Sequence, residues 1–349
     1  MMTLGVFYHS ALIYATEGYW RITSPNNSIV FSWFADVVHA FRMPAFYIVA
    51  GFFIAMASSK YPMRHVVKDR LFRLGVPMIT IGFTLNYAMN FFSSNRVYDF
   101  SSISYIINGD WLGHLWFVGN LIVYVIMYFA CQKYIAKIRL DGLKSTYLLL
   151  LMVLISTVLS VFFIGIFHYI GKTVLVFISV GPLLSYFCYF VLGVVFFNNK
   201  NFFLSLSNDK LFSLQTRFFL VLLFVLVISE WFGTNSLFLK ILWIFAGSFL
   251  SIYVLSVFNR YAIDSSINRA ISNCSYTIYL LHQPLIILMY PIISYFNFDL
   301  WVSYMLLTLL VLLSSYLVHS IFVKKSRLFM FLINGVPYSR KYKIFGAGK

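Results

Sequence analysis

Long apolar runs, separated by short polar segments, extend along almost the whole of this 349-residue chain. About ten of them are long enough to cross a hydrocarbon core of roughly 30 Å, which needs about 20 residues of helix. The run Leu148 to Phe167 shows no alternation of apolar and polar residues, which excludes the pattern of a membrane β-strand. The chain is therefore predicted to be an all-α, polytopic transmembrane helical bundle. The predicted spans are residues 1–16, 29–58, 74–92, 111–131, 145–167, 173–197, 218–232, 241–258, 273–293 and 300–323.

The composition agrees with this pattern. Hydrophobic residues make up 61% of the chain and charged residues only 10%, and the mean hydropathy is +0.85. Soluble domains are about one quarter charged, so a water-soluble enzyme is excluded. We predict a membrane domain at residues 1–323 and a basic cytoplasmic tail at residues 324–349.

The net charge of +16 would suggest a nucleic-acid partner in a soluble protein, but its distribution indicates membrane topology instead. Of the 26 Lys and Arg residues, 21 fall in the segments 59–73, 132–144, 198–217, 259–272 and 324–349, which lie on one side if the spans alternate. The opposite side has four: Arg21, Arg96, Lys172 and Lys240. Basic residues stay in the cytoplasm, so both termini are predicted to be cytoplasmic and the lipid bilayer replaces nucleic acid as the partner.

Ionisable residues inside the predicted spans are the first candidates for a site, because each costs roughly 2.5–3.5 kcal/mol to insert. His9 lies in the first span. Asp36, His39 and Arg42 lie in the second, spaced so that all three face one broad stripe of the helix. His9 and Asp36 are each eight residues from the outer end of their helix, roughly 12 Å deep at about 1.5 Å per residue. Asp36 beside His9 would fix the imidazole tautomer and raise its basicity, as a general base requires. The alternative is an internal ion-pair network that only holds the helices together.

Three further groups of residues suit binding. Arg70 and Arg73 are three residues apart, so on a helical turn both guanidinium groups face the same way and suit a phosphate, although cytoplasmic basic residues are expected there in any case. His114 and Trp116 suit an outer, sugar-binding pocket, although tryptophans near a span's end are also typical of an aromatic belt. His282 and Gln283 are followed by Pro284, which should break the helix and leave a lined cavity.

Six motifs in this order resemble the membrane-bound acyltransferase 3 family, and within it the glucans biosynthesis protein C group. The motifs are Phe7-Tyr8-His9-Ser10-Ala11-Leu12-Ile13-Tyr14, Asp36-Val37-Val38-His39-Ala40-Phe41-Arg42-Met43-Pro44, Gly51-Phe52-Phe53, Arg70-Leu71-Phe72-Arg73-Leu74-Gly75-Val76-Pro77-Met78, His114-Leu115-Trp116-Phe117 and Tyr279-Leu280-Leu281-His282-Gln283-Pro284. They cover nearly the whole chain.

The resemblance implies a multi-pass protein of the bacterial inner membrane that moves an acyl group, acetyl or succinyl, from cytoplasmic acyl-CoA to a hydroxyl of an extracytoplasmic glycan. It implies that His9 is the essential histidine of the first helix and that Arg70 and Arg73 bind the acyl donor. Asp36 or His39 would orient His9, and Arg42 would pair with a succinyl carboxylate or balance Asp36. No metal and no cofactor beyond the acyl-CoA substrate is expected. The competing class is a transporter of glycans or organic anions that uses the same His, Asp and Arg stripe.

Overall fold

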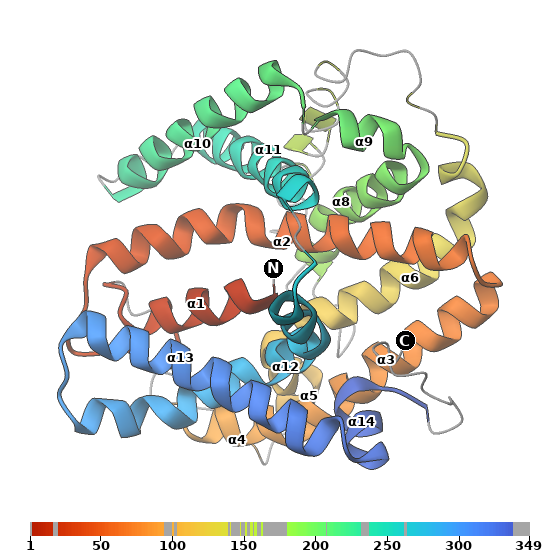
Figure 1. The fold of residues 1–349 in the computed structure, drawn as a ribbon. Helices are drawn as coiled ribbons and strands as arrows, with labels where there is room; N and C mark the ends of the chain where they lie inside the picture. The colour runs from red at the N-terminus through yellow and green to blue at the C-terminus, as the bar shows by residue number, and fades with distance from the viewer. Residues whose placement is uncertain are drawn as a thin grey trace.

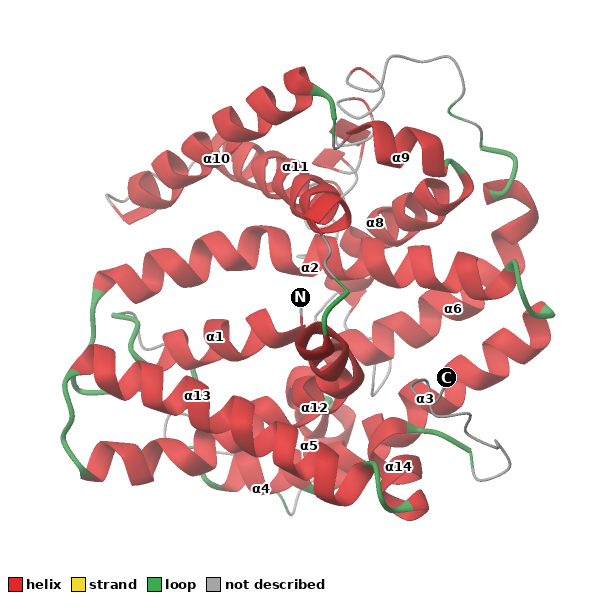
Figure 2. Cartoon of the chain, viewed as in Figure 1, coloured by secondary structure: helices red, strands yellow, loops and turns green. Residues whose placement is uncertain are grey.

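The computed structural model is a bundle of helices (Figure 1), and Figure 2 shows no strand in the part of the chain that it describes. It describes residues 2–16, 20–93, 100, 103–138, 140, 180–206, 208–231, 237–261 and 264–337, together with single positions between 147 and 162. The predicted all-α class is confirmed for these residues. The helices are α1 (Met2–Ile13), α2 (Ile29–Ser58), α3 (Met63–Phe83), α4 (Leu85–Phe91), α5 (Ser104–Ile107), η1 (Asp110–Leu115), α6 (Trp116–Ile135), α8 (Val180–Asn198), α9 (Lys200–Leu206), α10 (Lys210–Trp231), α11 (Leu237–Tyr261), α12 (Ser266–Tyr295), α13 (Leu300–Val318), η2 (His319–Val323) and α14 (Arg327–Asn334).

Short polar side chains fix where several of these helices begin. Ser28 accepts a hydrogen bond from the backbone N–H of Val30 at the start of α2, and Ser265 does the same for Asn268 at the start of α12. Such caps satisfy backbone donors that have no partner inside the helix. At the other end of the chain, Gly335 ends α14 with a φ of 63°, a left-handed conformation that suits glycine.

Five described helices are long and apolar enough to cross a membrane. They are Ile29–Ser58, Ser104–Ile135, Ile241–Tyr261, Ser266–Tyr295 and Leu300–Val323. A sixth span results if Pro182–Asn198 and Lys200–Leu206, bent by 103° at their junction, are counted together. Shorter apolar helices, Met2–Ile13 and Phe212–Ile228, lie at two more of the predicted spans. The chain is thus a multi-pass membrane protein, while the count of ten spans and the orientation of the termini stay predictions. Most of the predicted span 145–167 lies outside the described residues.

Several predicted boundaries are wrong. The predicted span 74–92 is divided into α3 and α4 at Thr84, and α3 begins at Met63, well inside a segment that was predicted as a loop. The predicted loop 198–217 is largely helical, in α9 and the start of α10. The segment 324–349 stays predicted as a basic cytoplasmic tail, and its first part forms α14, which packs against α3 and α12. Hydropathy reports which residues fit in lipid, and it therefore misses helical turns that carry charge.

Helix α2 runs through the middle of the bundle, with α8, α10 and α11 on one side and α1 on the other (Figure 1). Its closest approach is to α8. A Cβ placed on Gly51 would lie 1.9 Å from the carbonyl oxygen of Phe190, and one on Gly193 would lie 1.9 Å from that of Ile48. Only glycine at both positions permits this backbone contact.

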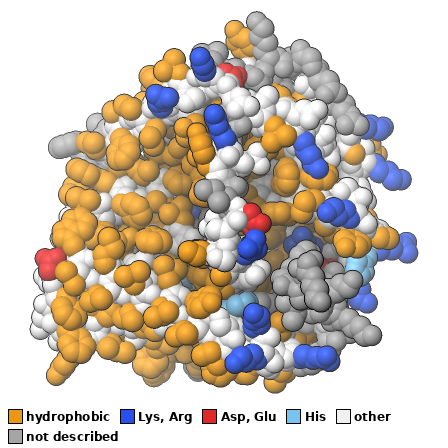
Figure 3. Space-filling model, viewed as in Figure 1, with side chains coloured by type: hydrophobic (Ala, Val, Ile, Leu, Met, Phe, Trp, Pro, Cys, Tyr) orange, Lys and Arg blue, Asp and Glu red, His pale blue; other side chains and the backbone are white. Residues whose placement is uncertain are grey.

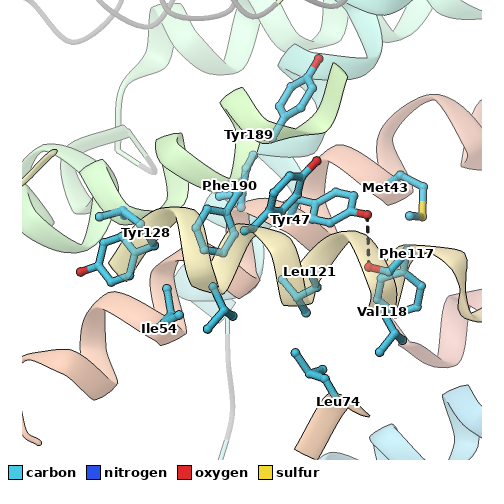
Figure 4. Close-up of a cluster of buried hydrophobic side chains, with 14 of the residues drawn as sticks. Met43, Tyr47, Ile54, Leu74, Phe117, Val118, Leu121, Tyr128, Tyr189 and Phe190 are labelled. Carbon is cyan, nitrogen blue, oxygen red and sulfur yellow. Dashed lines mark hydrogen bonds between the residues drawn. The ribbon is translucent and has the colours of Figure 1, made fainter. Parts of the chain in front are cut away.

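Aromatic side chains from α2, α6 and α8 fill the core beside this crossing (Figure 4). Tyr47 is fully buried between Tyr124 and Tyr186, whose ring centroids both lie 5.2 Å from its own. Its hydroxyl donates to the backbone oxygen of Phe117, 3.5 Å away. This packing joins α6 to α2, and both helices contribute residues to the site described below.

The surface separates apolar from basic residues. In the view of Figure 3, hydrophobic side chains cover the left part of the molecule, over α1, α2 and α13, whereas most Lys and Arg side chains lie to the right and along the upper and lower edges. A broad apolar band with cations gathered away from it is the surface expected of a membrane-embedded bundle.

Candidate active site

Four of the predicted spans meet around a cavity of about 80 Å³. Its walls come from α1, α2, α12 and the segment that joins η1 to α6. The lining residues are Met2, Gly5, His9, Arg42, Met43, Phe46, His114, Trp116, Phe117, Tyr279, His282 and Gln283. Six predicted site residues from four separate stretches of sequence therefore lie around one cavity: His9, Arg42, His114, Trp116, His282 and Gln283. The volume is far below the roughly 300–1,000 Å³ of a pocket that encloses a whole small molecule, so the cavity accommodates only the reacting end of a larger one.

His9 is held from the side of α12. The side-chain amide nitrogen of Gln283 lies 2.9 Å from Nε2 of His9 and 3.2 Å from its Nδ1, and donates a hydrogen bond to the ring. The ring of Trp20 stacks on His9 with the centroids 5.7 Å apart, and the His282 ring lies 5.2 Å away. His9 is thus a ring fixed by an amide and two aromatic neighbours at the edge of the cavity.

Helix α12 continues through Pro284 to Tyr295, so the prediction that Pro284 breaks this helix is wrong. His282 is 1% exposed, and its Nδ1 lies 2.5 Å from the backbone oxygen of Tyr279. A carbonyl oxygen only accepts, so Nδ1 donates, and in the neutral ring Nε2 then carries a lone pair. Nε2 is buried and has no hydrogen-bond partner among the described residues.

His114 also has one ring nitrogen bonded to a backbone oxygen and one without a partner, but here Nε2 is the bonded one. Its Nε2 donates to the backbone oxygen of Leu280, 3.2 Å away, and its buried Nδ1 has no partner among the described residues. The neighbouring Gly113 has a φ of 52°, which favours glycine, and turns the chain from η1 into α6. Tyr279 fixes the same turn by donating to the backbone oxygen of His114 at 2.7 Å.

A polar layer beneath this turn was not predicted. The amide nitrogen of Asn86 donates to the backbone oxygens of Trp111 and Leu112, at 3.3 and 2.6 Å. Arg21 donates to the side-chain oxygen of Asn90, and both are buried. Their role in holding η1 depends on a tertiary contact between α4 and η1, which no local motif signals.

Arg42 points its guanidinium group at the cavity from α2. Its Cζ lies 4.0 Å from the centroid of the Tyr8 ring, a cation–π contact. Within the described part of the chain no carboxylate lies within ion-pair distance of Arg42, and its buried Nε has no hydrogen-bond partner there. A buried guanidinium costs free energy unless something pairs with it, so this arrangement favours a polar ligand.

Asp36 and His39 do not line the cavity. His39 lies beside α1 at Tyr8, whose hydroxyl is 3.3 Å from its Nδ1, and its ring centroid is 6.1 Å from that of Trp243. Asp36 is near enough to Tyr8 for their charges to interact. The described hydrogen bond to His9 comes from Gln283, and an orienting role for Asp36 or His39 stays a prediction.

Arg70 and Arg73 lie on α3, away from the cavity. Nε of Arg73 forms an ion pair with Asp69 at 3.1 Å, and the hydroxyl of Tyr276 donates to the Arg73 backbone oxygen at 2.8 Å. Tyr276 is six residues before His282 on α12, a rise of about 9 Å at 1.5 Å per residue. Helix α12 therefore connects the arginine pair with the cavity.

Residues that the sequence reasoning missed are Gly5, Tyr8, Trp20 and Tyr279. Tyr8 and Tyr279 stand inside the motifs quoted above, directly before His9 and three residues before His282, which was the available signal.

Within the described residues, no group of three or more His, Cys, Asp or Glu side chains is arranged to hold a metal ion.

The described helices thus form a multi-pass membrane bundle in which imidazole and guanidinium groups gather around one buried cavity. The chain belongs to the acyltransferase 3 family, whose acyltransferase-domain model matches residues 1–320.

Two relatives share the same name. Glucans biosynthesis protein C of Escherichia coli (strain K12) is 28% identical over 220 residues, which cover 56% of this chain and 55% of that protein. Glucans biosynthesis protein C of Salmonella typhi is 40% identical over 80 residues, which cover 23% of this chain and 21% of that protein. The match thus spans about half the length of the first relative and about one fifth of the second. No solved structure matches the chain.

Proposed function

We propose that this protein is an O-acyltransferase of the bacterial inner membrane, which moves an acetyl or succinyl group from cytoplasmic acyl-CoA to a hydroxyl of an extracytoplasmic glycan. The observation that carries the proposal is the buried cavity in which His9 faces His282, His114 and Arg42. Family membership supplies acyl transfer, and the printed names of the relatives suggest a glucan as the acceptor.

The reaction needs a base on the hydroxyl and stabilisation of the oxyanion that forms when it attacks the thioester. When the acceptor binds, its hydroxyl replaces the Gln283 amide at the lone pair of His9. His9 then takes the hydroxyl proton while the new C–O bond forms at the thioester carbon. The C–S bond then breaks, and the CoA thiolate leaves and takes up the proton. Arg42 is the nearest cation to the cavity and stabilises the negative charge on the oxygen.

The donor enters from the side of Arg70 and Arg73, whose guanidinium groups bind the CoA phosphates in this proposal. The thioester reaches the cavity along α12, past Tyr276 and Tyr279. The distance of about 9 Å between Tyr276 and His282 along the helix axis is one that an extended pantetheine arm spans. Acyl-CoA and glycan then meet at His9 from opposite ends of the bundle.

The test uses purified full-length protein in lipid vesicles with radiolabelled acetyl-CoA or succinyl-CoA outside and a β-glucan oligosaccharide inside. Label on the oligosaccharide, lost in His9→Ala protein of normal abundance, is the expected result. Uptake of oligosaccharide or organic anion across the membrane without acylation favours the transporter and overturns the proposal.

A further inference from the structure

The space beside Gly5 differs from that beside other buried glycines. Among the described residues outside its own turn of helix, a Cβ placed on Gly5 would have two atoms within 4 Å, Nη1 of Arg42 and Nε2 of His282, each at 3.6 Å. These are ordinary van der Waals distances, so alanine would fit. Gly5 is nevertheless in the interior of α1, where glycine destabilises a helix by roughly 1 kcal/mol relative to alanine. The missing side chain leaves a place in the cavity wall that touches two polar groups.

Those two groups require different partners. Arg42 has only N–H donors, so an atom in this place must accept from it. Nε2 of His282 carries a lone pair in the neutral ring, because Nδ1 donates to the Tyr279 backbone oxygen, so the same atom must also donate. A hydroxyl group accepts and donates at once. An ionised carboxylate only accepts, and it would face the lone pair of His282.

We infer that Gly5, Arg42 and His282 form a subsite for a hydroxyl group of the acceptor, in which the hydroxyl accepts from Arg42 and donates to His282. Nε2 of His282 is buried and has no partner among the described residues, which is the state expected of a group that awaits a ligand. The buried Nδ1 of His114, whose ring lies 5.4 Å from that of His282, offers a second lone pair in the same wall. Two acceptors beside one guanidinium group suit a polyhydroxylated ligand such as a sugar.

This inference rests on the proposed function and names the part of the site that recognises the acceptor. Gly5 is then a specificity-determining position, because any side chain there takes the place of the hydroxyl. His282 is a binding residue for the acceptor and does not act on the acyl donor. The acyl group therefore has a separate place, nearer to His9 and the α12 path.

The experiment compares Gly5→Ala, Gly5→Val, His282→Phe and His282→Gln in the full-length protein. Acyl transfer from acyl-CoA to a β-glucan oligosaccharide is measured with each substrate varied in turn. Gly5→Ala and His282→Phe are expected to raise the KM for the oligosaccharide at least tenfold and to leave the KM for acyl-CoA within twofold. His282→Gln is expected to recover most of the loss, because its amide oxygen supplies an acceptor near the position of Nε2.

The matched control is Gly75→Ala, another glycine inside a helix, where a Cβ would meet no atom of the described residues outside its own turn of helix within 4 Å. It is expected to leave both KM values unchanged. If Gly5→Val does not fold, judged by size-exclusion chromatography, Gly5→Ala decides the question. Equal changes in the two KM values, or an unchanged KM for the oligosaccharide in Gly5→Ala and His282→Phe, overturn the inference.

A binding measurement separates this inference from the proposed function. Saturation-transfer NMR of the same oligosaccharide needs no turnover, and its signal should be lost in Gly5→Val and kept in Gly75→Ala. If the wild-type protein binds the oligosaccharide with this dependence on Gly5 but transfers no acyl group, the subsite is supported and the proposed acyltransferase function is overturned. If the wild type transfers the acyl group and Gly5→Val gives the same saturation-transfer signal from the oligosaccharide as the wild type, the subsite alone is overturned.

Discussion

The side-chain amide of Gln283, on α12, lies 2.9 Å from Nε2 of His9, on α1, although 274 positions separate the two residues in the chain. The contact joins the first helix to the helix that carries His282, another histidine of the cavity. An amide orients an imidazole by hydrogen bonding without adding a net charge, which a carboxylate would do. The first prediction concerns what this difference does to catalysis.

His9→Ala is expected to lower kcat by roughly 10²–10⁴, the usual contribution of a general base. Gln283→Leu should cost only about threefold to tenfold, because one hydrogen bond contributes about 1 kcal/mol net. Rates of acyl transfer, normalised to folded protein, check both values. The control is Gln132→Leu, whose amide donates to a backbone oxygen of its own helix outside the cavity. A Gln283→Leu protein with wild-type rates, beside an Asp36→Asn protein that is strongly impaired, would return the orienting role to Asp36.

The sequence allowed the ionisable residues of the cavity to be predicted but not their pairing. Each of His9, Arg42, His114 and His282 is an ionisable group inside an apolar run, which is a local signal. The depth argument that brought Asp36 beside His9 used the rise per residue. Depth does not say how each helix is turned about its axis, and that rotation is set by packing such as the contact of α1 with α12.

The helices also fall into two groups, those that a local sequence pattern predicts and those that depend on tertiary packing. Apolar runs predicted α2, α11, α12 and α13 closely, because helices in lipid must satisfy their own backbone groups. The break at Thr84 carries neither glycine nor proline, so no local chemistry announces it. Helix α14 escaped prediction because an eight-residue amphipathic helix is defined by what it packs on, here α3 and α12.

The second prediction concerns the donor site. Arg73→Ala and Arg70→Ala are expected to raise the KM for acyl-CoA by about tenfold to a hundredfold, since a hydrogen bond to a charged group contributes about 1.5–3 kcal/mol. Arg73→Lys should recover only part of this, because the planar fork is lost. Direct titration with acyl-CoA gives the same comparison as a dissociation constant.

The matched control is Arg64→Ala, on the same helix. Arg64 lines a shallow surface groove with Phe72 and Phe129 and is not beside Tyr276. Arg64→Ala removes one cation from the same helix and leaves Arg70 and Arg73 in place. Equal loss of acyl-CoA affinity in Arg64→Ala and Arg73→Ala would show that only the general positive charge of this segment matters.

The third prediction tests the crossing of α2 and α8. Gly51→Ala and Gly193→Ala each place a methyl group 1.9 Å from a backbone oxygen, so the helices must move apart. Overpacking of this kind costs typically 1–3 kcal/mol, and more where only backbone can yield. Thermal unfolding in detergent should show a lower midpoint for both variants, whereas Gly75→Ala should unfold at the same or a higher temperature because alanine favours the helix there. Wild-type midpoints in both variants would mean that the two helices do not meet at these glycines.

The fourth prediction is topological. The 21-to-4 distribution of Lys and Arg predicts that both termini are in the cytoplasm. A reporter fused after Lys349 is expected to be active only if it works in the cytoplasm. The same reporter fused within the segment 94–99, on the opposite predicted side, should give the reverse result. Activity of a periplasm-dependent reporter after Lys349 contradicts the orientation and the direction of donor entry.

The last prediction separates a chemical from a structural role for Arg42. Its guanidinium group is buried against the Tyr8 ring, and no carboxylate of the described residues pairs with it. Replacing such a cation by an apolar side chain of similar length should leave stability unchanged or higher, because the cost of burying the charge disappears. Arg42→Met is therefore expected to accumulate normally and to unfold at no lower temperature than the wild type.

Acyl transfer by Arg42→Met should nevertheless fall by about tenfold to a hundredfold, because a hydrogen bond from a charged group contributes about 1.5–3 kcal/mol. Arg260→Met is the control, since Arg260 also lies over a tyrosine ring, 5.4 Å from the Tyr261 centroid, but outside the cavity. It should retain wild-type transfer. An ion pair between Asp36 and Arg42 that only holds helices together gives the opposite pattern, in which Arg42→Met and Asp36→Asn both fail to accumulate. Membrane abundance, unfolding midpoint and transfer rate, measured together for the three variants, decide between the two roles.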